Sequence, residues 1–154
     1  MRSFLKYFLL VSLSFNSFSK NDQKGELQLT IKNLQNLNKG KLLVLLFNEK
    51  NWAPDKPEKA LKINKFDVLK KNITVTIKDI PYGTYAIGLI HDVNNNGKLD
   101  TRWIPPGMPS EDVGASNNAE GGPFGGPPWE KAKIILNKKS VTLKPIEMAH
   151  LFKD

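Results

Sequence analysis

The sequence contains no cysteine, which excludes both a disulfide framework and a lipid anchor attached through an N-terminal cysteine. It also lacks helical periodicity, because apolar residues do not recur every three to four positions over any window of useful length. The two glycine signatures of phosphate binding, G-x-x-x-x-G-K-[ST] and G-x-G-x-x-G after a strand, do not occur. We therefore expect neither a helical bundle nor a nucleotide-binding domain, and packing alone must hold the fold.

Acidic residues are fewer than basic ones, 15 against 23, and the formal net charge is +8. The lysines are spread singly along the chain and do not form a cluster. Nucleic-acid-binding proteins concentrate positive charge on one face, so this distribution indicates solvated strand faces and no nucleic-acid partner. At most, we expect a loose attraction to anionic polymers of the cell envelope.

The N-terminus has the organisation of a secretory signal peptide. Arg2 and Lys6 precede an apolar run over residues 8–15, and Ser17 and Ser19 are small residues at the positions that a signal peptidase reads. The run is much shorter than the ~20 residues that span a bilayer, so we predict no membrane span after cleavage. Cleavage of residues 1–19 leaves one domain, 20–154, with a formal charge of +6 and a periplasmic or extracellular location.

Strand patterns dominate this domain. Apolar and polar residues alternate over 27–32 and 73–78, and residues 41–48 are almost continuously apolar, as in a strand buried on both faces. Further apolar runs predict strands over 86–91, 132–136 and 141–151, with Pro145 at an edge or bulge. Residues 49–62 are predicted to form a loop with at most one helical turn, in which Trp52 covers the core. The spacing favours an all-β fold, a single antiparallel β-sandwich.

We predict that residues 92–130 form one long, ordered loop. The segment 101–130 is rich in proline and glycine, yet it contains Trp103, Phe124 and Trp129, and disordered linkers lack such residues. These aromatic side chains either pack locally or anchor a partner, such as a sugar ring or an apolar peptide.

Residues 92–100, D-V-N-N-N-G-K-L-D, have the spacing of a calcium-binding loop. EF-hand loops supply oxygen ligands from positions 1, 3, 5, 7 and 9, with glycine at position 6 for a sharp turn. The corresponding ligands here are the side chains of Asp92, Asn94, Asn96 and Asp100 and the carbonyl of Lys98. Gly97 occupies the sixth position.

The match is incomplete at position 12, where Trp103 replaces the bidentate glutamate. Glu111 or Asp112 would have to supply the missing ligand, and we predict a weak Ca²⁺ site with a Kd of about 0.1 to 1 mM that includes Glu111. Without an ion, Asn96 and Gly97 would simply form a tight turn, since both residue types tolerate positive φ.

The leading functional hypothesis is a non-enzymatic binding or structural module whose partner is a cell-envelope protein or glycan. The alternative is a metal- or histidine-dependent hydrolase that uses His91, Asp92 and a hydroxyl such as that of Ser116. His91 and Asp92 point to opposite faces if both lie in a strand, and two histidines are few for a catalytic zinc. We therefore predict no catalytic residues and no organic cofactor.

Several linked motifs resemble the bacterial DUF2141 family of exported proteins. They are Gly83-x-Tyr85, residues 91–100, Gly107-x-Pro109-x-Glu111, Gly114-x-Ser116-Asn117-Asn118, and Gly126-Pro127-Pro128 followed by Ala132. The resemblance implies a small secreted β-sandwich of prealbumin or immunoglobulin-like type and no established activity. It also implies that Glu111, Ser116, Asn117 and Asn118 fold back over the Asp92 loop.

Overall fold

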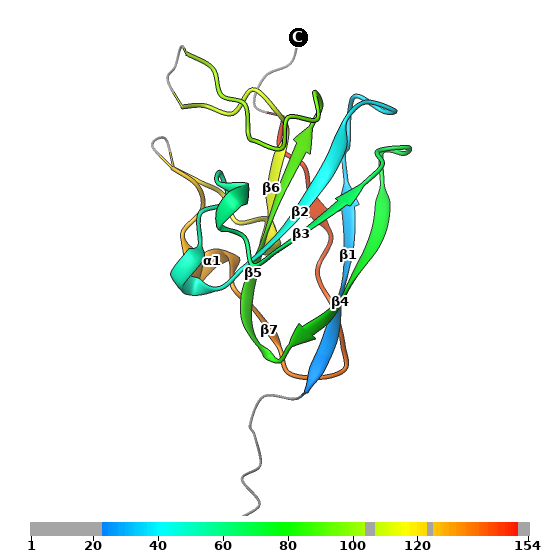
Figure 1. Ribbon diagram of the computed structural model, residues 1–154, viewed down its shortest axis with the longest axis vertical. Helices are drawn as coiled ribbons and strands as arrows, with labels where there is room; N and C mark the ends of the chain where they lie inside the picture. The colour runs from blue at the N-terminus through cyan, green and yellow to red at the C-terminus, as the bar shows by residue number, and fades with distance from the viewer. Residues whose placement is uncertain (1–22, 104–106, 123–124, 151–154) are drawn as a thin grey trace, which may run out of the picture.

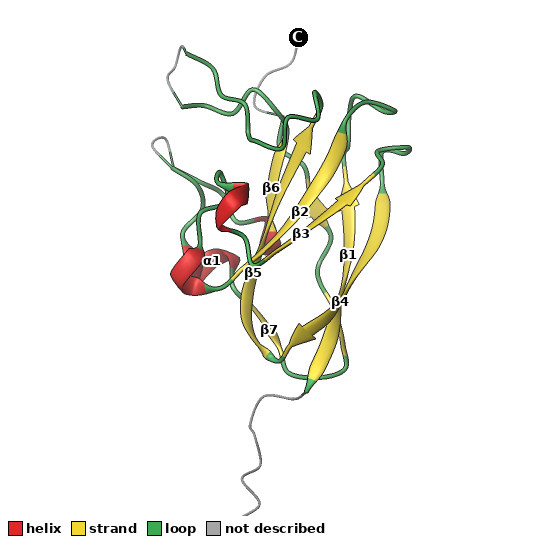
Figure 2. Ribbon diagram, viewed as in Figure 1, coloured by secondary structure: helices red, strands yellow, loops and turns green. Residues whose placement is uncertain are grey.

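The computed structural model describes residues 23–103, 107–122 and 125–150 as a sandwich of two β-sheets (Figures 1 and 2). The predicted signal peptide, residues 1–19, lies outside these ranges. One sheet contains β4 (Ile73–Pro81), β1 (Lys24–Lys32), β8 (Ser140–Thr142) and β9 (Ile146–Glu147). The other contains β3 (Lys62–Phe66), β2 (Lys41–Phe47), β5 (Gly83–Asp92), β6 (Val113–Ala115) and β7 (Ile134–Leu136). The all-β sandwich predicted from the strand spacing is confirmed.

Most strand pairs are antiparallel, as predicted, but β8 and β9 both run parallel to β1. The sequence predicted one strand over residues 141–151. Instead, Pro145 separates two short strands, because proline has no N–H to donate to a ladder.

The hydrophobic core explains the patterns of the central strands. Leu27, Leu29 and Ile31 of β1 point into the space between the sheets, and intervening residues are half-buried. β2 is buried on both faces, as predicted: Leu42, Val44 and Leu46 join the main core, whereas Leu43, Leu45 and Phe47 join a second cluster on the outer face. Trp52 and Leu99 cover this second cluster.

Three segments differ from the sequence predictions. β3 was missed, and the loop before it contains two short 3₁₀ turns, η1 (Glu49–Asn51) and η2 (Pro57–Lys59). The segment 92–130 is not a single loop, because it includes β6, the turn η3 (Ser116–Asn118) and the start of the short helix α1 (Trp129–Ala132). Within the described ranges, no helix has the length and apolarity needed to cross a bilayer.

Candidate metal centre

The Asp92 loop, residues 92–100, begins at the last residue of β5, at the end of the sandwich that is uppermost in Figure 1. β5 ends at Asp92, which pairs with Lys41 of β2. The turn before β2 packs closely against Asp92, because a Cβ on Gly40 would be 1.9 Å from the carbonyl oxygen of Asp92. Gly40 also has φ +60°, so only glycine fits this position without strain.

The carboxylate of Asp92 is buried and organises the turn from inside. Its Oδ1 accepts the N–H of Asn96 at 3.0 Å, and its Oδ2 accepts the N–H of Gly97 at 2.8 Å. Positive φ occurs at Asn95 and Gly97, and not at the predicted pair Asn96 and Gly97. The tight turn predicted at Asn96 and Gly97 is therefore not formed as expected, because the left-handed residues are Asn95 and Gly97.

The next two amide side chains add local turns. Oδ1 of Asn94 accepts the N–H of Asn96 at 3.1 Å, and Oδ1 of Asn96 accepts the N–H of Lys98 at 2.8 Å. Both are Asx turns, in which a side-chain oxygen bonds backbone two residues further on. The amide groups then donate to Asp100, from Asn94 Nδ2 at 2.6 Å and from Asn96 Nδ2 at 2.9 Å.

Glu111 joins the loop from a distant position in the sequence. Its two carboxylate oxygens accept the N–H groups of Val93, at 2.9 Å, and Asp100, at 3.1 Å, so it connects both ends of the loop. The structure therefore brings Asp92, Asn94, Asn96, Asp100 and Glu111 together. Lys98 lies in the same loop with an exposed side chain, and its N–H is used by Asn96.

The surroundings of Glu111 disfavour its ionised form. Burial raises the pKa of Glu111, the two backbone N–H donors lower it, and the charges of Asp100 and Asp92 raise it further. Ion pairs outside this cluster join Lys32 with Glu147, Lys41 with Asp67, Lys133 with Glu130, and His150 with Asp112.

Across the described ranges, no three histidine, cysteine or acidic side chains stand close enough together to hold a metal ion by themselves. Any cation here would depend on amide and backbone oxygens as well as carboxylates. Each carboxylate oxygen already accepts one N–H, and a carboxylate has further lone pairs for a hard cation. Carboxylate and carbonyl oxygens are the types of ligand that calcium accepts.

The residues of the alternative hydrolase hypothesis are not assembled. Nε2 of His91 lies 2.9 Å from the carbonyl of Lys39. The hydroxyl of Ser116, fully buried, accepts the N–H of Ile87 at 2.9 Å and donates to the carbonyl of Ala132 at 2.5 Å. Ile87 and His91 are four residues apart on β5, which corresponds to about 13 Å along a strand.

Ser116, Asn117 and Asn118 do not fold over the Asp92 loop, so this expectation was wrong. Ser116 connects β5 to the end of α1, and Asn117 Nδ2 donates to the carbonyls of Lys131 and Lys133 on either side of that end. Only Glu111 of the four residues reaches the loop.

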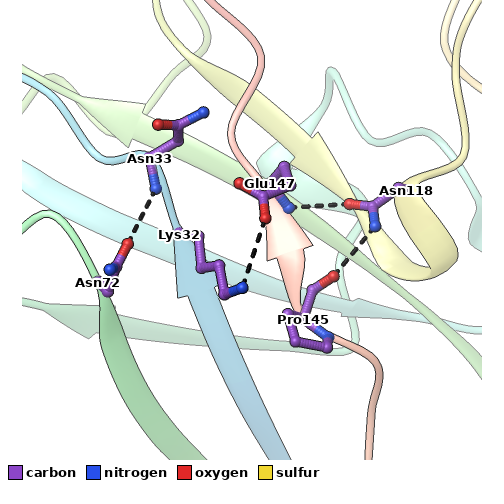
Figure 3. A network of polar contacts seen from close by, with 6 residues as sticks. All are labelled: Lys32, Asn33, Asn72, Asn118, Pro145 and Glu147. Atoms are coloured by element: carbon purple, nitrogen blue, oxygen red, sulfur yellow. Dashed lines mark hydrogen bonds and ion pairs between the residues drawn. The ribbon is translucent and has the colours of Figure 1, made fainter.

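Asn118 connects η3, which follows β6, to β9 in the other sheet. Its Nδ2 donates to the carbonyl of Pro145 at 3.0 Å, and its Oδ1 accepts the N–H of Glu147 at 2.8 Å (Figure 3). The side-chain amide of Asn118 thus donates to and accepts from the backbone of this segment, as a peptide group of a neighbouring strand would. Oε1 of Glu147 lies 3.8 Å from Nζ of Lys32 on β1. We call residues 116–118 the Ser-Asn-Asn clamp. Sequence reasoning missed it because its partners are distant in the chain.

A family model described as "uncharacterized protein conserved in bacteria (DUF2141)" matches residues 18–144. The chain belongs to the DUF2141 family. No curated protein and no solved structure matches it. The resemblance found in the sequence is thereby confirmed, and the family brings no activity with it.

In this DUF2141 chain, the aromatic residues of the long segment have different surroundings. Trp103 is 86% exposed, whereas Trp129 is half-buried and packs against Trp52, with 6.1 Å between ring centroids. Trp52 covers the second cluster, as predicted, and its Nε1 donates to the carbonyl of Pro127 at 2.7 Å. Phe124 lies outside the described residues.

Proposed function

We propose that this protein is an exported, non-catalytic β-sandwich module of the bacterial cell envelope whose Asp92 loop is stabilised by calcium. The observation that carries the proposal is that the carboxylates of Asp92, Asp100 and Glu111 all bond to the same loop, to which Asn94 and Asn96 add amide oxygens. Two of the carboxylates come from the loop itself, and the third comes from a segment 11 residues beyond its end. The proposed partner is an envelope protein or glycan.

The charge of the cluster supports a divalent cation. Burial raises the pKa of Glu111, and the negative charges of Asp100 and Asp92 raise it further, so ionising Glu111 costs free energy in the absence of a cation. Calcium would remove this cost, because it interacts with carboxylate oxygens and balances their charge.

Weak affinity is expected from the same contacts. The carboxylates already accept six N–H donors: those of Val93, Asn96, Gly97 and Asp100, and the side-chain amides of Asn94 and Asn96. The Oδ1 atoms of Asn94 and Asn96 also accept backbone N–H groups, so an ion would compete with the loop's own hydrogen bonds for these oxygens. Such competition favours a millimolar extracellular site over a tight intracellular one.

Thermal unfolding with and without calcium tests the proposal. A site with a Kd of about 0.1 to 1 mM gains about 1.4 to 2.7 kcal/mol at roughly 10 mM calcium. This corresponds to an increase in Tm of about 3 to 10 °C for a domain of this size. The measurement uses the protein as purified after export. The intact mass of this protein also tests whether the signal peptide is cleaved after Ser19.

Two variants complete this experiment. Asp92→Ala should remove the calcium-dependent increase in Tm, because it deletes the ligand at the first position of the loop. Asp55→Ala is the matched control, since Asp55 is exposed in another loop, and it should retain the increase. Equal Tm values in calcium and in chelator for the unsubstituted protein would contradict the proposal.

A further inference from the structure

A second candidate site lies on the side of the sandwich, near the opposite end of β5 from the Asp92 loop. An open hollow of about 410 Å³ is lined by Asn48, Glu49, Lys50, Thr84 and Trp129. Its volume is within the range of small-ligand sites, about 300 to 1,000 Å³. Thr84 and Asp92 are eight residues apart on β5, about 26 Å along the strand, so the hollow is separate from the proposed calcium site.

A column of aromatic rings supports one wall of the hollow from behind. Phe47, fully buried, meets Trp52 edge to face with 5.4 Å between centroids, and Trp52 meets Trp129 in the same way at 6.1 Å. The bond from Trp52 Nε1 to the carbonyl of Pro127 fixes the middle ring just before α1 begins. Trp129 is therefore held in place before any ligand arrives, which lowers the entropic cost of binding.

The rest of the lining is polar and balanced in charge. Glu49 and Lys50 carry opposite charges, and neither side chain makes a hydrogen bond or ion pair within the described ranges. The Asn48 side-chain oxygen caps η1 by accepting the N–H of Asn51 at 3.0 Å, so its Nδ2 is left to donate to a ligand. The hydroxyl of Thr84 both donates and accepts.

We propose that this hollow binds a neutral sugar residue of a glycan, with one face of the sugar ring on Trp129 and the ring hydroxyls on the polar rim. A sugar ring combines an apolar C–H face with hydroxyls that donate and accept, which matches an indole surrounded by amide, carboxylate, ammonium and hydroxyl groups. An apolar peptide side chain would leave those polar groups unpaired, at a cost in free energy. A charged ligand would meet one attractive and one repulsive side chain.

This inference rests on the proposed role as an envelope-binding module, but it does not depend on calcium. Two probes test this inference: the β-1,4-linked tetrasaccharides of glucose and of N-acetylglucosamine. Each is titrated into the exported protein, and binding is measured by calorimetry. We expect saturable binding of at least one probe, unchanged by chelator. Trp129→Ala should weaken it at least about tenfold, as expected when an aromatic anchor is removed.

Trp103→Ala is the matched control, because Trp103 is exposed on a different segment and should leave binding unchanged. Trp129 also packs on Trp52, so a second variant keeps the aromatic column intact: Glu49→Gln combined with Thr84→Ala should weaken binding severalfold without changing Tm. Absence of saturable binding of both probes up to about 10 mM would overturn the inference. Binding that is lost in Trp103→Ala but not in Trp129→Ala would overturn it as well. A calcium-dependent Tm without sugar binding would support the proposed calcium site and reject only the proposed sugar site.

Discussion

Two asparagine-rich segments of this molecule use the same side chain in opposite ways. In the Asp92 loop, Asn94 and Asn96 bond to backbone and to a carboxylate within six residues. In the Ser-Asn-Asn clamp, Asn118 bonds to backbone 27 and 29 residues away, and Ser116 reaches 29 residues back to Ile87. The hydrogen bonds of the first segment stabilise its own conformation, whereas those of the second segment connect parts of the chain that are distant in sequence.

The difference suggests how stability and ligand response are divided. We expect calcium to replace internal hydrogen bonds of the loop without disturbing the sheets, because β5 ends at Asp92. The clamp cannot do so, since Ser116 is buried and Asn118 joins η3 to β9. We therefore expect clamp substitutions to lower stability in every condition, and loop substitutions to act chiefly through calcium.

The largest expected effect is that of Ser116→Ala. It leaves the buried N–H of Ile87 without its acceptor and the carbonyl of Ala132 without its donor, so the free energy of unfolding should fall by about 2 to 3 kcal/mol. Urea unfolding measures it. The calcium-dependent gain should be retained, and Ser110→Ala, at an exposed serine, should be close to neutral. A loss below about 0.5 kcal/mol would show that the clamp is not needed.

Asn118→Ala should have the next largest effect. It removes two hydrogen bonds that hold β9, at Pro145 and Glu147, but the side chain is exposed and water can replace part of them. We expect a loss of about 1 to 2 kcal/mol in urea unfolding. Asn137→Ala, in the exposed turn after β7, is the control and should change stability by less than about 0.5 kcal/mol. Equal losses in the two variants would remove the special role of Asn118.

The smallest effect is a pH dependence of the calcium response. Because the pKa of Glu111 is raised above its ordinary value of 4.5, the folded state holds this proton more tightly than the unfolded state. The stability that Glu111 contributes is thus complete below the unfolded pKa and is lost as pH rises through the folded pKa. Calcium favours the ionised carboxyl, so its increment in Tm should be larger at pH 7 than at pH 4. An equal increment at both values would exclude Glu111 as a ligand, and Glu111→Gln should reduce the increment at pH 7.

The comparison also explains what the sequence could and could not predict. β2 was recognisable because six consecutive apolar residues, 42–47, indicate burial on both faces, and the Asp92 loop was recognisable because most of its contacts are local. β3 was missed because its half-buried positions, Lys62, Asn64 and Phe66, include two polar residues, whereas Ile63 is exposed. The clamp was assigned to the wrong place because its bonds depend on which distant segments the fold brings to η3.

The most direct test of the account is a calcium titration followed by the backbone amide resonances in NMR. The N–H groups of Asn96 and Gly97 bond to Asp92, and that of Asp100 bonds to Glu111, so we predict that these resonances shift in a saturable way with a common Kd of about 0.1 to 1 mM. The amides of Ile87 and Glu147, which bond to the clamp, should not move. If the amide resonances of the loop do not shift up to about 10 mM calcium, the account is contradicted and the Asp92 loop is a turn that binds no ion.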